Sequence, residues 1–246
     1  MQQRRITVVP TLIIGLGGTG SLGIQFAKNY ISEQLKPYTF NQVLPEKIPF
    51  VKFFSIDTTG QEKDYSNLSG DEFEYIGALT SREIKNMKRN HKEELQWFPD
   101  SLSSAQINAG ARGVRQLGRL CFYKYKPVIQ NRLNEKINKL KNLDEIKNEI
   151  EKHFINLSAD TEASRIDIHL ISSMCGGTGS SCLLDVAFLL RHLLSNLNPR
   201  ISAHLVGPEG FNADNSIGVK AKEYIKYNFA VTLAEIERFI NVEQNF

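Results

Sequence analysis

Apolar residues follow two alternating patterns along this chain. Short runs rich in β-branched and aromatic residues predict buried strands at residues 6–14, 50–56, 166–172 and 201–206. Elsewhere the apolar residues recur at helical spacing, which predicts helices at residues 21–34, 84–97, 116–140, 144–154, 182–194 and 219–240. Strands that alternate with helices predict an α/β fold, namely one Rossmann-like domain over residues 1–246 whose mostly parallel sheet has helices on both faces.

Two local signals refine the helix predictions. Thr80-Ser-Arg-Glu83 has the spacing of a capping box, so a helix is expected to begin directly after Thr80. Pro127 lies inside the longest predicted helix, where it is expected to cause a kink or a break because proline has no backbone N–H.

Composition narrows the class of protein. The 246 residues are 41% hydrophobic, which is enough for a packed core, and the formal net charge of +3 gives no reason to expect a nucleic-acid partner. No apolar run approaches ~18 residues, so no membrane span is expected. The three cysteines lack metal-binding spacing, and the amino terminus lacks the apolar region of a signal peptide. We therefore expect a cytoplasmic protein.

A first glycine-rich turn follows the first predicted strand. Residues 15–20 read Gly-Leu-Gly-Gly-Thr-Gly, which matches G-x-G-x-x-G between a strand and a helix. Glycine lets the backbone approach a phosphate, and the helix N-terminus offers unpaired N–H groups. A dinucleotide site would have an acidic residue about 20 residues further on, whereas here Asp57 comes much later. An NAD-dependent oxidoreductase is therefore the weaker alternative.

A second glycine-rich turn follows the third predicted strand. It is formed by Gly176-Gly-Thr-Gly179, with Ser180 and Ser181 next in the chain. Consecutive small residues allow successive backbone amides to point at one anion, and the hydroxyl groups can add further donors. Neither turn contains the G-K-[ST] of a P-loop NTPase. Two such turns, each after a strand, predict a site for the phosphates of a nucleotide.

These motifs resemble the tubulin/FtsZ superfamily, most closely its bacterial tubulin-like branch. LISSMCGGTGSS is similar to the phosphate-binding motif of that family, and TLIIGLGGTGSLG is similar to its first nucleotide loop. SIDTTG, NAGARGVRQLGR and VGPEGFN fall, in order, where the second, third and fifth loops are expected. The resemblance implies a GTPase domain that binds GTP or GDP with Mg²⁺ and associates with itself into filaments.

The resemblance also implies roles for individual residues. Asp57 would lie near the phosphates or hold their Mg²⁺, and Glu209 would reach the ribose. The backbone of the glycine turns would hold the phosphate chain, and the third loop would cap the terminal phosphate. Arg112 and Arg115 could pair with phosphate or could be solvated charges of the loop. The remaining nucleotide contacts would be made by Gly15, Gly17, Gly18, Thr19, Gly20, Gly110, Ala111, Arg112, Gly113, Gly176, Gly177, Thr178, Gly179 and Ser180.

The sequence departs from the family pattern in two ways. Ser181 replaces the last glycine of the motif, and Cys175 takes a position usually held by a smaller residue. The central helix, the acidic catalytic loop and the second domain of the family are not evident before Phe246, so the catalytic residues stay unassigned and we expect slow hydrolysis by this chain alone. A non-catalytic interaction module that keeps the fold is a third alternative.

Overall fold

A five-stranded parallel sheet forms the centre of the computed structural model, which describes residues 6–45, 47–60, 68–103, 105, 107, 110–159, 165–197, 199–212 and 219–243. Its strand order is β4-β3-β2-β6-β7. The strands are β2 (Thr11–Leu16), β3 (Val51–Asp57), β4 (Phe73–Tyr75), β6 (Asp167–Ser173) and β7 (Arg200–Val206). Two further strands, β1 (Ile6–Val8) and β5 (Leu157–Ala159), pair with each other in parallel.

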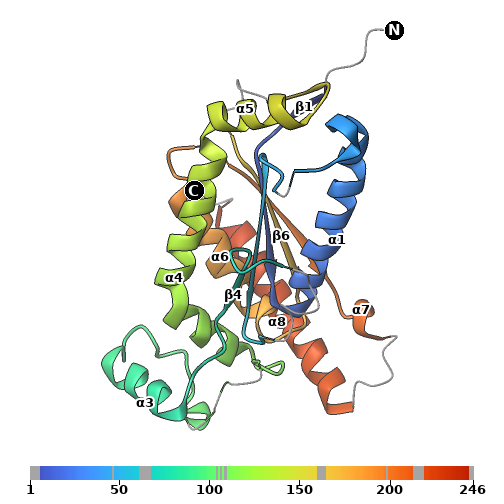
Figure 1. Ribbon diagram of the computed structural model, residues 1–246. Helices are drawn as coiled ribbons and strands as arrows, with labels where there is room; N and C mark the ends of the chain where they lie inside the picture. Colours follow the sequence, from blue (N-terminus) through green and yellow to red (C-terminus); the bar gives the residue numbers. More distant parts are fainter. Residues whose placement is uncertain are drawn as a thin grey trace.

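Helices cover both faces of this sheet, as Figure 1 shows with α1 on one side and α4 and α6 on the other. The long helices are α1 (Gly17–Leu35), α4 (Arg115–Lys141), α6 (Gly179–Leu193) and α8 (Val219–Glu243). Shorter ones are α3 (Ser81–Asn90), α5 (Leu143–His153), α7 (Glu209–Asn212) and the 3-10 turns Lys36–Tyr38, Phe40–Gln42 and Asp100–Leu102. The predicted α/β fold with a parallel sheet and helices on both faces is confirmed.

The alternation of side chains along β2 divides the core in two. Leu12, Ile14 and Leu16 point to one face and pack among buried residues of α4 and α6. Ile13 points to the opposite face and packs with Ile24 of α1 and with residues of α5. Because neighbouring side chains of a strand point to opposite faces, both sides of β2 are buried, as its apolar sequence requires.

The register of the sheet places the two glycine-rich turns side by side. Gly15 of β2 lies opposite Ser55 of β3 and Ile171 of β6. All of these strands run in the same direction, so the turns that follow them emerge at one edge of the sheet. This is the edge at which open α/β sheets bind ligands.

The first predicted strand, residues 6–14, is divided in two by the structure. Residues 6–8 form β1 on the small sheet, and residues 11–16 form β2 on the large one. Pro10 lies between them, and its carbonyl accepts a hydrogen bond from the N–H of Asp167 at 3.0 Å. Proline has no N–H to donate to a strand ladder, so the chain changes sheets at this point.

The capping box is confirmed, because the hydroxyl oxygen of Thr80 accepts from the N–H of Glu83 and the Glu83 carboxylate accepts from the N–H of Thr80. Two other helix predictions, the end of α3 and the break at Pro127, need correction. The helix α3 ends at Asn90 rather than Trp97, and the turns that follow bury Leu95 and Phe98. A break at Pro127 is wrong, since α4 continues through it. Packing of α4 against the core outweighs the one lost hydrogen bond.

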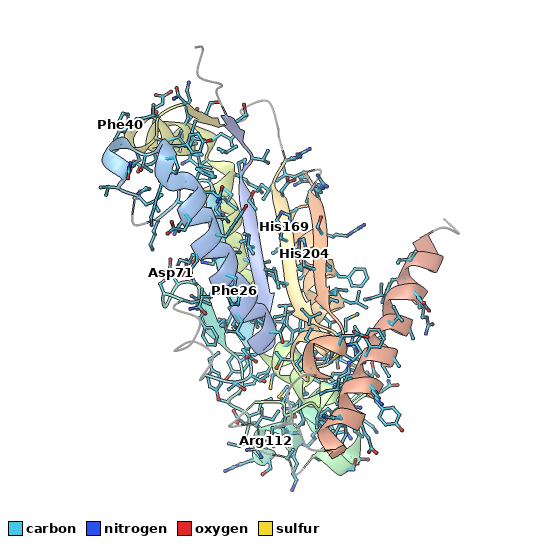
Figure 2. All side chains as sticks on the ribbon, turned by 90° about the vertical axis from the view of Figure 1, so that its right-hand side faces the viewer. Phe26, Phe40, Asp71, Arg112, His169 and His204 are labelled. Atoms are coloured by element: carbon cyan, nitrogen blue, oxygen red, sulfur yellow. The ribbon has the colours of Figure 1, made fainter. Side chains whose placement is uncertain are left out.

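Three apolar side chains of α1 point away from the core. Leu22, Phe26 and Tyr30 lie on one side of the helix and are exposed, whereas Ile24 and Leu35 are buried. Figure 2 shows Phe26 on this outer side. No helix within the described residues has the length and the apolar character needed to cross a bilayer.

Candidate functional site

The first glycine-rich turn joins β2 to α1 at very close range. A Cβ placed on Gly20 would lie 2.5 Å from the carbonyl oxygen of Ile171 and 2.7 Å from the carbonyl carbon of Gly15. These contacts involve backbone atoms, which cannot move aside, so Gly15 and Gly20 allow α1 to approach β2 and β6. Gly17 has φ +70°, a left-handed conformation that glycine adopts without strain. Gly18 and Thr19 are the partly exposed residues of the turn.

The second glycine-rich turn joins β6 to α6 and is held by its own hydroxyl groups. The Ser181 hydroxyl donates to the carbonyl oxygen of Gly177 at 2.7 Å, and the Ser180 hydroxyl donates to that of Gly176. Both serine hydroxyls are therefore used inside the turn. The backbone N–H groups of Gly179 and Ser180 belong to the first turn of the helix, where no intrahelical acceptor is available.

The N-termini of α1 and α6 share an electrostatic property. Neither helix has a side-chain cap, and neither has an acidic residue in its first turn, which is also true of α4. By contrast, α3 is capped by Thr80 with Glu83 in its first turn, and α5 is capped by Asn142 with Asp144 and Glu145 in its first turn. The unpaired N–H groups and the positive dipole end of α1 and α6 are therefore not neutralised by side chains of these helices.

These two N-termini are in contact. A Cβ on Gly17 would lie 3.2 Å from the backbone nitrogen of Gly179 and 3.5 Å from the Cβ of Thr178. The positive ends of two helix dipoles thus meet at the carboxyl edge of the sheet. An anion placed there would be attracted by both, which is the arrangement that binds phosphate groups in many α/β proteins.

The third loop lies directly on the second turn. A Cβ on Gly177 would lie 2.8 Å from the Cβ of Ala111 and 3.0 Å from the nitrogen of Gly113. Gly110, Arg112 and Gly113 have φ of +85°, +49° and +80°. The two glycines adopt this conformation without strain, whereas Arg112 keeps it only where its surroundings hold it. Asn108 and Ala109, which also belong to the predicted loop, lie outside the described residues.

The two arginines of the third loop have different surroundings. Arg112 is exposed, lies at the lower end of the molecule in Figure 2, and has no hydrogen bond or ion pair with another described residue. Arg115 donates to the carbonyl oxygen of Ser180 at 2.9 Å and pairs with Glu235 of α8. Arg115 therefore connects α4, α6 and α8, whereas Arg112 is available to a ligand or a partner.

The end of β3 is joined to both neighbouring loops by Thr58. Its hydroxyl oxygen accepts from the N–H of Ala111 at 2.9 Å and is hydrogen-bonded to the Thr178 hydroxyl at 2.6 Å. Asp57 is only 3% exposed, and its Oδ1 accepts from the N–H of Thr58 at 2.6 Å. Thr58, which was not predicted from the sequence, thus links the end of β3 to the third loop and to the second glycine-rich turn.

A magnesium ion at Asp57 would depend on the nucleotide for most of its ligands. Within the described residues, no three His, Cys, Asp or Glu side chains lie close enough together to hold a metal ion. Mg²⁺ commonly takes one or two carboxylates, together with water and substrate phosphates. A single carboxylate beside a phosphate site fits that requirement, so Asp57 remains a predicted ligand.

Glu209 and Cys175 lie on the β7 side of the second turn. Glu209 is exposed in α7, and its Oε2 would be 2.8 Å from a Cβ on Gly207. Burial raises the pKa of the Cys175 thiol above its ordinary value, and the charge of Glu209 adds to that effect. A buried thiol with a raised pKa stays protonated and is a poor nucleophile.

Two buried polar residues of α8 were also missed by the sequence prediction. Asn228 donates from its side-chain nitrogen to the carbonyl oxygens of Gly113 and Cys175, at 2.8 Å each. Thr232, one turn further along, donates to the carbonyl oxygen of Met174 at 3.2 Å. A polar pair four residues apart among apolar positions was the available signal, but the sequence does not show which loops the pair would contact.

A hollow of about 800 Å³ lies behind these loops, between α4, α6 and α8. Aromatic and charged side chains line it, among them Trp97, Arg119, Tyr227 and Phe239. Of the residues predicted to contact phosphate, Gly113, Ser180 and the candidate Arg115 reach it, and those of the first turn do not. The hollow therefore lies next to the predicted phosphate site rather than at it.

A comparison of the sequence with models of known protein families gives a match. The family model described as "Tubulin like" matches residues 12–246. The chain belongs to the tubulin-like family. This membership confirms the resemblance to the tubulin/FtsZ superfamily. A comparison with curated proteins finds no match.

Solved structures similar to this tubulin-like chain include two CetZ proteins. CetZ from Methanosaeta thermophila strain DSM 6194 has a TM-score of 0.45 and 15% identity, over 92% of this chain and 44% of its own. CetZ2 from Haloferax volcanii, described as a GTPγS-bound protofilament, has a TM-score of 0.40 and 13% identity, over 91% of this chain and 56% of its own. The tubulin-like chain thus spans about half the length of these proteins.

A matched pair of substitutions tests which glycines are needed for packing. We expect Gly20→Ala to lower the free energy of unfolding by about 1–3 kcal/mol, because its methyl group would overlap the backbone of Ile171 and Gly15. We expect Gly176→Ala to change stability by less than about 0.5 kcal/mol, since a Cβ there has nothing within 4 Å. Urea unfolding measures both. Equal stability of the two variants would contradict the assigned close contact.

Proposed function

We propose that this tubulin-like chain binds guanine nucleotides through their phosphates at the carboxyl edge of the sheet. The observation that carries the proposal is the contact between two uncapped helix N-termini, at Gly17 and Gly179. Backbone N–H groups attract an anion there without any basic side chain, and no acidic residue in the first turn of either helix compensates that attraction.

Each loop has a proposed part in binding. Gly17, Gly18 and Thr19 would contact phosphate from the first turn, and Gly176–Ser180 would do so from the second. Gly110, Ala111, Arg112 and Gly113 would close over the terminal phosphate. Asp57 would hold Mg²⁺ bound to the phosphates, and Glu209 would reach the ribose. Gly15 and Gly20 would act through packing, because their positions are filled by neighbouring backbone.

Nucleotide-dependent self-association is the second part of the proposal. Arg112 is exposed at the third loop and uncommitted among the described residues, so a terminal phosphate could order it at a contact between two copies of the chain. Ordering of a loop by a γ-phosphate is the switch used by other nucleotide-binding proteins. We also propose that such assembly takes place in the cytoplasm, in keeping with three buried, free cysteines.

The alternatives make different demands on the second turn. An NAD-dependent oxidoreductase needs only the first glycine-rich turn, so the second turn and its contact with Gly17 would take no part in binding the dinucleotide. A non-catalytic interaction module would keep both turns for packing alone. α4 also lacks a side-chain cap, so what favours an anion ligand over this last alternative is that the uncapped N-termini of α1 and α6 meet at one point.

The first prediction concerns ligand preference. We expect GTP or GDP with Mg²⁺ to bind more tightly than NAD in a calorimetric titration, because the second turn supplies donors for a phosphate chain that a dinucleotide site does not require. NAD binding of equal or greater affinity would favour the oxidoreductase. Absence of binding by all three ligands would favour the interaction module.

The second prediction concerns Gly177. We expect Gly177→Val to abolish GTP binding while the chain stays folded, because its side chain would push Ala111 and Gly113 away from the second turn. Gly70→Val is the matched control, since a Cβ on Gly70 meets nothing within 4 Å and the site lies elsewhere. Calorimetry gives the affinity and circular dichroism the fold. Wild-type affinity in a folded Gly177→Val protein would show that the turn has only a structural role.

A further inference from the structure

The outward face of α3 carries three cations and no carboxylate. Arg82, Lys85 and Arg89 recur at i, i+3 and i+7, so they share one side of the helix, and all three are exposed. None of them has an ion pair or a hydrogen bond with another described residue. The formal net charge of the whole chain is +3, so this one face concentrates as much positive charge as the chain has in excess.

The other cations around α3 are paired. Lys88 pairs with Asp100, and Lys124 of α4 pairs with Glu83 at 2.8 Å. Glu83 also accepts in the capping box that begins the helix. Residues 92–94, in the turn after α3, carry one lysine and two glutamates and therefore add no positive charge. The carboxylates that contact α3 are thus already engaged, and the outward face stays uncompensated.

A second hollow, of about 560 Å³, separates α3 from α4 and adjoins this face. Asn86 and Asn90 lie next to the cations around the helix and line the hollow, where Met87, Tyr123 and Pro127 add apolar surface. Pro127 has no N–H, so the carbonyl oxygen of Tyr123 lacks the donor that a regular helix supplies. The hollow therefore offers apolar surface together with hydrogen-bonding groups. Figure 1 shows α3 beside the lower end of α4.

A further cation borders the hollow on the α4 side. Lys126 lines it, is exposed, and has no ion pair or hydrogen bond with another described residue. Glu83 is the carboxylate in the described lining, and it is paired with Lys124. Unpaired cations therefore lie on both helices that border the hollow. A ligand that complements this surface carries carboxylates around an apolar part.

We propose that the outward face of α3 and the adjoining hollow, together called the α3–α4 surface, bind an acidic amphipathic segment of a partner protein. Apolar side chains of the segment enter the hollow, and its carboxylates pair with Arg82, Arg89 and Lys126. Cations at i, i+3 and i+7 repeat at the pitch of a helix, so a helical segment with carboxylates at the same spacing matches them. The proposal is independent of the nucleotide site, none of whose proposed residues lines the hollow.

Other polyanionic partners fit the α3–α4 surface less well. Proteins that bind duplex DNA through its backbone make about 6–10 phosphate contacts, more than Arg82, Lys85, Arg89 and Lys126 can supply. Binding to an anionic membrane requires an apolar helix face that enters the lipid. The outward face of α3 is polar instead, and the apolar groups beside it line the hollow. An acidic protein segment uses both the cations and the hollow.

A display library of peptides of about 12 residues, which is about three helical turns, tests the proposal. Peptides are selected on the wild-type chain and counter-selected on the double variant Arg89→Glu/Lys126→Glu. We expect the enriched peptides to be acidic, with apolar residues at helical spacing. Fluorescence anisotropy then gives the affinity of one enriched peptide for the wild type and for each single variant. Lys147→Glu is the matched control, because Lys147 is exposed in α5 and its reversal changes the net charge equally.

We expect Arg89→Glu and Lys126→Glu each to lower the affinity for the peptide about tenfold, because each reversal replaces an exposed ion pair with a repulsion of similar size. Lys147→Glu should keep the wild-type affinity, and urea unfolding should give one midpoint for all four proteins. Failure to enrich acidic peptides, or an equal loss of affinity in Lys147→Glu, would overturn the proposal. Displacement of the peptide by tighter-binding DNA would indicate a nucleic-acid site instead. Self-association that Arg89→Glu abolishes would indicate a second copy of the chain as the occupant, and would likewise contradict the proposal.

Discussion

The close approach of α1 to the sheet is the constraint on which the site depends. At Gly15 and Gly20 the helix comes so near to β2 and β6 that a single methyl group would overlap backbone atoms. Because of this approach, the N-terminus of α1 reaches the end of β6 and meets the turn that begins α6. A bulkier residue would move the helix outward and separate the two N-termini. The glycines of the first turn therefore have a packing role that precedes any contact with phosphate.

Main-chain groups, rather than basic side chains, supply the positive potential at this edge. The formal net charge of the chain is only +3, and Arg115, which contacts the second turn, is hydrogen-bonded to Ser180 and paired with Glu235. Helix dipoles and N–H groups are fixed in direction, so they favour an anion of defined shape and position. Arg112 is the exposed charge that can add to this arrangement when a ligand or a second copy of the chain is present.

The sequence predicted those parts of the molecule that depend on local patterns. Four strands of the large sheet, the glycine-rich turns and the capping box at Thr80 follow from short-range spacing, whereas the short strands β4 and β5 were not predicted. Thr58 and Asn228 were not predicted, because their partners are 53 to 120 residues away along the chain. The continuity of α4 through Pro127 was not predicted either, because it depends on packing against residues distant in the sequence, which outweighs the local preference of proline.

The nucleotide that the chain retains tests the central claim most directly. Purified protein would be equilibrated with equal concentrations of GTP, ATP and NAD in the presence of Mg²⁺, separated from free ligand, and denatured to release what it holds. Two uncapped helix N-termini beneath the third loop predict that a nucleoside triphosphate is released in preference to NAD, and the match to the tubulin-like family leads us to expect GTP rather than ATP. Release of NAD alone, or of no nucleotide, would contradict the assignment of this edge as a guanine-nucleotide site.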